Sequence, residues 1–279
     1  MANTNQQQPT EESIVKLRQR FLQEEVEKNP GLYHEIDVKR IGEEEWEVRR
    51  FLLEYNCDMQ VAFDAMIRCY RWKKEFGVHD RKDDMFPKEL WELADCARAK
   101  DGTFVQMEAF RNQRTYKELK ELPKQFIAHM LERVDRMAGQ SGFIMLIDAG
   151  GAGPSNVNMD LIKFKMTIVE NYPSSLKKIL IVDLPWILNP VMTIIINFLN
   201  PKLKEILTYQ KSKELLEMME RNELPESLGG TRTKPNIPEN LIPLAYMADK
   251  LDLTDKFVDT FYSNLKMKHS FFSFMHSYN

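Results

Sequence analysis

The chain is poor in the residues that usually mark a disulfide framework, a zinc site or a nucleic-acid partner. It has three cysteines, an odd number without a CxxC pair, and free thiols are typical of a reducing compartment. The formal net charge is −3 and no long Lys/Arg run occurs, so we expect no nucleic-acid partner. The N-terminal stretch MANTNQQQPTEES lacks the basic start and apolar run of a signal peptide, which predicts a cytoplasmic protein.

Catalytic and cofactor motifs are also missing. The glycine-rich stretch Asp148–Pro154 lacks the Gly-Lys-Ser/Thr of a phosphate-binding loop and the spacing of a dinucleotide fingerprint. No Gly-x-Ser-x-Gly elbow for a hydrolase nucleophile occurs. The histidines show no metal-ligand spacing; they are His34, His79, His129, His269 and His276. We therefore predict no catalytic residue, no metal and no cofactor, and we expect His129 to be structural.

The most apolar stretch, Ile179–Leu199, approaches the roughly 20 apolar residues that a membrane-spanning helix needs. Polar residues and prolines interrupt it, namely Asp183, Pro185, Asn189, Pro190 and Asn197. Because proline breaks a helix or sits in its first turn, the sequence favours a strand, a turn and a short apolar helix over a membrane span.

Hydrophobic periodicity divides the chain into four parts. Residues 1–10 are polar and predicted to be disordered, whereas residues 11–99 show helical spacing throughout and predict a helical N-terminal subdomain. In that subdomain Asp58 is expected to cap a helix that ends near Phe76, followed by Gly77. Residues 100–245 predict an α/β domain, and residues 246–279 a C-terminal helix, expected over Pro243–Leu265, and a tail.

The α/β part alternates strand and helix patterns. Strands are predicted at Thr103–Phe110, Phe143–Asp148, Lys178–Asp183 and Ile206–Tyr209, and helices at 123–140, Met159–Asn171 and Lys211–Arg221. In the first strand Gln106 and Glu108 lie on the face opposite Val105, which is typical of a half-buried strand. Strand–helix–strand units of this spacing predict a parallel sheet with right-handed crossovers.

The predicted helix Pro190–Leu199 is apolar around most of its circumference. Only Thr193, Asn197 and Asn200 form a narrow polar stripe. A surface helix normally buries about a third of its circumference, so this helix has more apolar surface than one packing contact can hide. Two interpretations stay open: a fully buried core helix, or a helix with a second apolar face toward a bound lipid or a bilayer.

Eight short motifs, in order, resemble the CRAL-TRIO lipid-binding family over about residues 43–230. They are Val48–Leu52, Asn56–Asp58, Tyr70–Lys73, Asp101–Thr103, Ile147–Gly151, Asn171–Pro173, Ile181–Pro185 and Leu224–Gly230. Asp183–Trp186 and Leu228–Thr231 are also similar to the N-terminal domains of motile sperm domain-containing proteins. The resemblance implies a mostly parallel sheet with helices enclosing an apolar cavity, preceded by a small all-helical subdomain.

The resemblance also implies which residues bind the ligand. It places a gate at Trp186–Leu199, and it assigns pocket and gate positions to Met145, Ile147, Met166, Val182, Trp186, Met192, Ile195, Phe198 and Leu199. The family's phosphatidylinositol headgroup positions fall on Ser174 and on Glu205, next to Lys204. The acidic partner is absent and the lysine is displaced, so phosphatidylinositol specificity is not supported.

Three functional hypotheses follow. The first is non-enzymatic binding of a hydrophobic small molecule or phospholipid, with transfer or sensing, by a cytoplasmic monomer that contacts membranes transiently. The second is a protein-protein or membrane-contact adaptor whose cavity is filled, with Met145, Met166 and Met192 as the fillers. The third is an enzyme that uses Asp148 and Asp183 at the carboxyl ends of two strands, although both carboxylates are expected to cap the following loops.

Overall fold

A computed structural model describes residues 7–119 and 121–265. The end of the predicted tail, residues 266–279, lies outside the described residues, as do residues 1–6. Residues 7–10 were predicted to be disordered, but here the backbone amide of Gln7 donates to Asn56 and the side chain of Thr10 caps the first helix.

The N-terminal region folds into four helices around one apolar core. They are α1 (Glu11–Arg20), continued by a π-helical turn Phe21–Val26, α2 (Glu35–Glu43), α3 (Trp46–Glu54) and α4 (Met59–Phe76). The predicted signals of α4 are confirmed: Asp58 accepts hydrogen bonds from two backbone amides, and Gly77 follows the helix at φ +69°. The core residues include Leu17, Phe51 and Met66.

The segment before the Asp101-Gly102 turn contradicts the prediction of helix up to residue 99. After the short helix α5 (Lys88–Glu92), residues Ala94–Arg98 form strand β1, which pairs antiparallel with β2 (Phe104–Ala109). The segment contains alanines and no β-branched residue, so its local propensity favours a helix. The tight turn and the neighbouring strand override that preference, as tertiary context often does.

The sheet has the order β1-β2-β3-β4-β5 and is parallel from β2 onward. The remaining strands are β3 (Phe143–Asp148), β4 (Leu176–Val182) and β5 (Leu207–Gln210). The crossovers carry α6 (Leu122–Ala138), α7 (Met159–Ile168), and α8 (Asn189–Phe198) with α9 (Pro201–Ile206). Because successive parallel strands are added in one direction, right-handed crossovers place all these helices on one face of the sheet, the front face.

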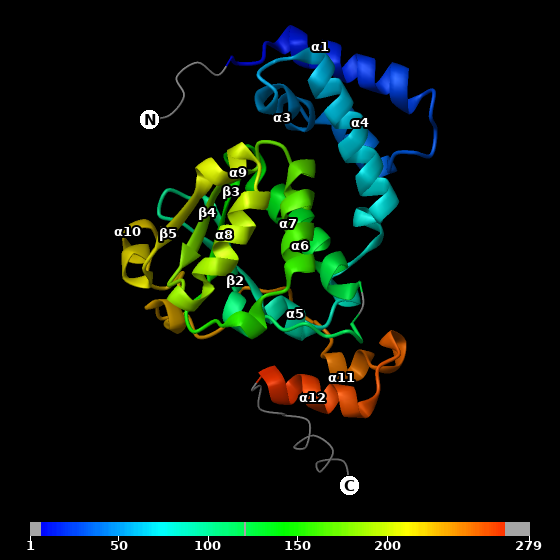
Figure 1. Ribbon diagram of the computed structural model, residues 1–279. Coiled ribbons are helices and arrows are strands. Elements are labelled where there is room, and N and C mark those ends of the chain that lie inside the picture. Colours follow the sequence, from blue (N-terminus) through cyan, green and yellow to red (C-terminus); the bar gives the residue numbers. More distant parts are fainter. Residues whose placement is uncertain (1–6, 120, 266–279) are drawn as a thin grey trace.

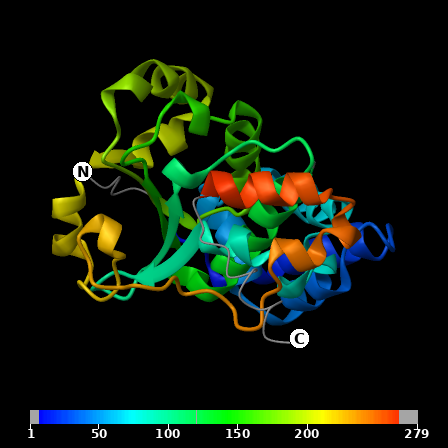
Figure 2. The same cartoon turned by 90° about the horizontal axis from the view of Figure 1, so that it is seen from below.

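The opposite, back face of the sheet is covered by a second apolar core. Val105, Leu146 and Leu180 lie there against α10 (Leu215–Met218) and the loop that follows it. Seen from below, α8 and the α10 region lie on different sides of the strands (Figure 2). The predicted helix Lys211–Arg221 is reduced to a 3-10 turn and the four residues of α10.

The C-terminal region forms two helices instead of the predicted single helix Pro243–Leu265. These are α11 (Leu244–Met247) and α12 (Asp255–Leu265), separated by Asp252 at φ +56°. Their apolar residues, among them Leu244 and Phe261, pack with Leu119 and Tyr116. Figure 1 shows α11 and α12 at one end of the molecule and the N-terminal helices at the other.

Buried ion pairs join the N-terminal helices to α6. The guanidinium of Arg50 donates to both carboxylate oxygens of Asp135, at 2.7 and 2.8 Å, and both side chains are 2% exposed. Nearby, Glu132 accepts from Arg40 at 2.7 Å and from Lys73 at 2.8 Å. Burial is the largest single influence and would raise the pKa of Glu132, but the attraction and hydrogen bond of Lys73, together with the attraction of His79 and Arg40, outweigh it, so the pKa is lowered.

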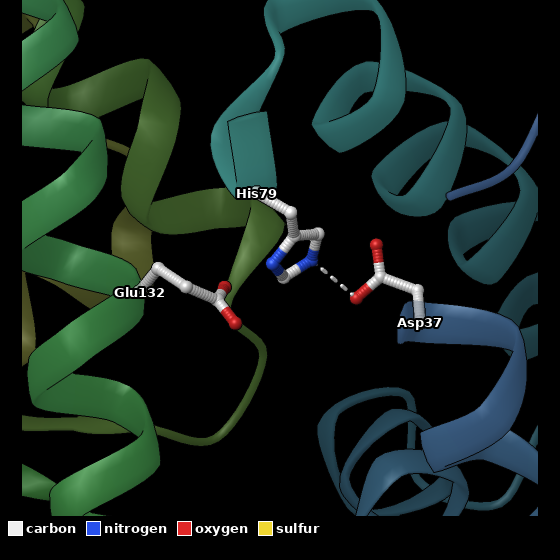
Figure 3. A group of neighbouring side chains, drawn as sticks. All are labelled: Asp37, His79 and Glu132. Carbon is white, nitrogen blue, oxygen red and sulfur yellow. Dashed lines mark hydrogen bonds and ion pairs between the residues drawn. The ribbon is translucent and has the colours of Figure 1, made fainter. Parts of the chain in front are cut away.

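Asp37, His79 and Glu132 converge from three elements at this junction (Figure 3). His79 lies 2.8 Å from Asp37, while Glu132 is held by its two cations. With Arg40 and Lys73 balancing the two carboxylates, the group is already near neutral, and a divalent cation would have to displace them. The cluster is therefore an ionic link between subdomains. His129 is structural as predicted, because it pairs with Asp83 at 2.7 Å.

Candidate functional site

The helix α8 is apolar yet hardly buried. Met192 is its only buried residue, whereas Ile194 is 50% and Phe198 is 55% exposed. Pro190 lies in its first turn, and Asn200 caps the next helix by accepting from the amide of Leu203. The core-helix interpretation is thus wrong. No helix among the described residues is both long and apolar enough to cross a bilayer.

An apolar pocket of about 120 Å³, here called the gate pocket, lies beneath α8. Its floor is the front face of β3 and β4, and α7 supplies one wall. Six residues with predicted pocket or gate roles line it, namely Met145, Ile147, Met166, Met192, Ile195 and Leu199. The structure therefore brings most of the predicted residues together around one hollow.

A second pocket of about 100 Å³, the inner pocket, lies between β2, α6 and α7. Its lining includes Phe126 and Met130 of α6 and Phe261 of α12. The two pockets share five lining residues, namely Glu108, Gln113, Met145, Lys165 and Val169. They are therefore neighbouring compartments on the same face of the sheet.

Three of the predicted pocket and gate residues do not line these pockets. Val182 lies on the back face with Leu180, because side chains alternate along β4 and Ile181 takes the front. Trp186 is 81% exposed and Phe198 points away from the gate pocket, with Lys163 Nζ 4.9 Å from its ring centre. The two aromatic residues therefore belong to the outer surface of the gate segment, Trp186–Leu199.

The predicted headgroup residues are not brought to either pocket. The amide and hydroxyl of Ser174 both donate to Glu54, at 2.8 and 3.0 Å, and Ser174 has φ +60°. Lys204 is exposed on α9. Ser174 thus ties the loop before β4 to α3, since Glu54 is the last residue of that helix.

The two carboxylates considered for catalysis cap loops instead. Asp148 accepts from the amide of Gly150 at 3.1 Å and pairs with Arg111 at 2.7 Å. Burial raises the pKa of Asp148, and Arg111 opposes that rise. Asp183 accepts from the amide of Ser212 at 3.2 Å. These contacts explain both residues without a reaction.

Sequence reasoning missed the charged residues of the pockets. Glu108 of β2 and Lys165 of α7 form an ion pair at 2.5 and 2.6 Å between the two compartments. The alternation in β2 predicts a half-buried strand, with Gln106 and Glu108 on the solvated face. An interior strand of a sheet covered on both faces has no solvated face, so Gln106 and Glu108 face the inner pocket.

Comparisons with known proteins agree with this geometry. Residues 99–230 match the family described as CRAL/TRIO domain. The chain is 27% identical over 195 residues to tyrosine-protein phosphatase non-receptor type 9 of Rattus norvegicus, covering 66% of this chain and 33% of that protein. It is 33% identical over 88 residues to phosphatidylinositol transfer protein CSR1 of Eremothecium gossypii, covering 31% and 20%. For SEC14 cytosolic factor of Yarrowia lipolytica the identity is 25% over 207 residues, covering 65% and 42%.

The chain thus spans a third of the length of the phosphatases that it matches. Among solved structures, the crystal structure of Sfh5 has a TM-score of 0.62 with 14% identity, covering 90% of this chain and 99% of that one. At this identity the likeness concerns the fold. Residues 99–230 thus resemble the CRAL/TRIO domain in sequence, and the chain shares its fold with Sfh5.

Proposed function

We propose that this protein binds one hydrophobic molecule of lipid size, without catalysis, and exchanges it with membranes by opening the gate segment. One observation carries the proposal: an apolar pocket, joined by a second one on the same face of the sheet, lies beneath a helix that is apolar on its outer side as well. The name of one relative, phosphatidylinositol transfer protein CSR1, favours a lipid ligand. A packed core would explain the inner side of α8 but not its outer side.

The energetics favour an apolar ligand. Each methylene removed from water contributes about 0.8 kcal/mol, so a chain of ten methylenes would gain on the order of 8 kcal/mol before the losses of ordering. The pockets are small as they stand, since an apolar cavity of about 150 Å³ accommodates benzene. A longer ligand therefore requires both compartments and an outward movement of α8.

The outer face of the gate segment is suited to a membrane surface. Trp186, Ile187 and Phe198 are exposed together with Ile194. Tryptophan is enriched at the boundary between headgroups and acyl chains, and apolar residues partition below it. Lys163 beside Phe198 adds a positive charge that anionic headgroups attract. Docking would expose the pockets to the bilayer as α8 moves away.

Mass spectrometry of solvent extracts tests the first part of the proposal. Protein produced in a eukaryotic host and purified without detergent is expected to carry about one lipid per chain. If no stoichiometric lipid is found, and none is taken up from vesicles, the carrier proposal is overturned in favour of an adaptor with an unused cavity.

Vesicle-to-vesicle transfer of a fluorescent phospholipid tests the gate. Replacing Ile195, whose side chain lines the gate pocket, by Asp places a charge in an apolar site and should abolish transfer. Thr193→Asp is the matched control, because Thr193 is exposed on the same helix. Transfer by the Ile195→Asp variant at the rate of the unmodified chain would refute the assignment of α8 as the gate.

A further inference from the structure

A charged pair and an amide oxygen without a hydrogen-bond partner among the described residues line both pockets, at the place where the pockets adjoin. Glu108, Lys165 and Gln113 line both compartments. The Glu108 and Lys165 side chains are 13% and 21% exposed, and almost all the other groups around the gate pocket are apolar. The side-chain oxygen Oε1 of Gln113 is buried and has no hydrogen-bond partner among the described residues.

An unpaired buried acceptor is unfavourable, by about 1–3 kcal/mol, and is normally satisfied by protein or water. Lys165 has three N–H donors, of which the two contacts with Glu108 use two. The junction therefore presents a donor on Lys165 and an acceptor on Gln113 to whatever occupies the pockets. A group that both donates and accepts one hydrogen bond would satisfy both.

The charges around the place where the pockets adjoin limit which polar group of a ligand can bind there. Glu108 and Lys165 are the charged residues that line the gate pocket, and they neutralise each other, so a ligand carboxylate or phosphate there would add a net negative charge close to Glu108 in a poorly solvated space. Arg114 lines only the inner pocket, where its Nη1 donates to the carbonyls of Arg111 and Gln113. A quaternary ammonium would meet Lys165 in the same way and has no N–H to donate. A hydroxyl is neutral, and it donates one hydrogen bond while accepting another.

We infer that Glu108, Lys165 and Gln113 form a polar subsite that selects a lipid whose polar end is a single neutral hydroxyl, with its apolar body in the two pockets. This inference rests on the proposed lipid-binding function. It concerns what occupies the junction when the gate is closed. It does not concern Ser174 or Lys204, which lie away from both pockets.

A competition assay with three probes of equal chain length tests the inference. Hexadecanol, its methyl ether and palmitate are each titrated against the full chain carrying a bound fluorescent apolar probe, and the displacement of that probe is measured. Hexadecanol is expected to compete at least about tenfold better than the methyl ether, which cannot donate, because a hydrogen bond to a charged or buried partner has about that effect. It should also compete better than palmitate.

Variants locate the effect. Gln113→Leu, and separately the charge-balanced double variant Glu108→Leu/Lys165→Met, should bring the alcohol and the ether to within about twofold of each other. Lys204→Met is the control for a lost lysine outside the pockets and should keep the tenfold preference. Circular dichroism verifies that each variant is folded, and the comparison of probes on the unmodified chain needs no variant.

The outcomes separate this inference from the proposed function. Equal displacement by all three probes, or a preference for palmitate, overturns the hydroxyl subsite while lipid binding stands. Failure of every probe, in protein that also yields no lipid on extraction, overturns lipid binding itself. If Gln113→Leu and the double variant keep the preference for the alcohol, another group binds the hydroxyl. That result would also overturn the assignment of Glu108, Lys165 and Gln113 as the subsite.

Discussion

Arg50 is expected to hold the N-terminal helices on the α/β domain, and its replacement by Met should destabilise the whole chain. From α3 its guanidinium reaches Asp135 of α6 with two hydrogen bonds, the hydroxyl of Ser175 with one, and the carbonyl of Pro173 through Nε at 2.9 Å. Burial alone would lower the pKa of Arg50, but Asp135 outweighs it and the pKa is raised.

The size of the effect follows from what remains after the substitution. Arg50→Met leaves the Asp135 carboxylate buried without its cation, and breaking such a pair from one side destabilises by about 3–5 kcal/mol. For a domain of this size each kcal/mol shifts Tm by about 2–4 °C, so Tm should fall by roughly 6–20 °C. Arg49→Met is the matched control, because Arg49 pairs with Glu45 on the surface. It should change stability by only about 0–1 kcal/mol.

Thermal unfolding followed by circular dichroism measures both variants under one set of conditions. The double variant Arg50→Met/Asp135→Leu replaces the pair by apolar groups and should recover most of the lost stability, because no charge is left unpaired. Additive losses in the double variant, or a fall in Tm for Arg50→Met no larger than for Arg49→Met, would refute the reasoning from buried charge.

Other predictions concern acid, thiols and the membrane. The pKa of Glu132 is lowered below its ordinary value of 4.5, so the ionised carboxylate stabilises the folded state fully above about pH 5. This stabilisation is lost as the pH falls, and Tm should therefore drop between about pH 5 and 3. A flat Tm there would contradict this. Burial raises the pKa of Cys69 to about 11 and of Cys96 to about 12, so iodoacetamide at pH 8 should modify only Cys57 in the native chain, as peptide mass spectrometry would show. Trp186→Ser should weaken co-sedimentation with anionic vesicles several-fold, because Trp186 lies on the surface proposed to contact the membrane. Tm should not change, since the side chain is 81% exposed; a fall in Tm would mean that Trp186 packs against the rest of the chain.

Much of the fold was predictable because local signals agree with the tertiary structure. The predicted strand Phe143–Asp148 has the same bounds in the structure, and the ends of α4 follow from Asp58 and Gly77. Each of these signals acts within a few residues: a continuous apolar run, a side-chain cap, a glycine with positive φ. The parallel order of the strands followed from connection length and handedness.

The candidate site was less predictable because it depends on what covers each face. Periodicity separates the two faces of a strand, but it does not indicate which face lines a pocket and which face packs against a helix or loop. Val182 and Ile181 are adjacent and similarly apolar, yet one packs against the back face and the other lines the gate pocket. Glu108 was taken for a solvated residue on the same grounds, although its strand proved to be interior. The resemblance thus implied an apolar pocket, but neither the resemblance nor the periodicity indicated the polar group inside it.

The attachments of α8 explain how a helix with so much exposed apolar surface is compatible with a gate. Besides the buried Met192 and Leu199, the contacts near its C-terminal end include the Lys163–Phe198 contact and a hydrogen bond from Asn200 to Glu170 at 2.9 Å. An exposed cation–π contact contributes about 0.5–1 kcal/mol and a hydrogen bond about 1 kcal/mol. Because Lys163 and Lys165 lie two residues apart on α7, that helix contacts the outer face of the gate and the polar junction beneath it. We therefore expect a ligand that shifts Lys165 to act on the helix that contacts Phe198, which would couple the occupancy of the pockets to the closure of the gate.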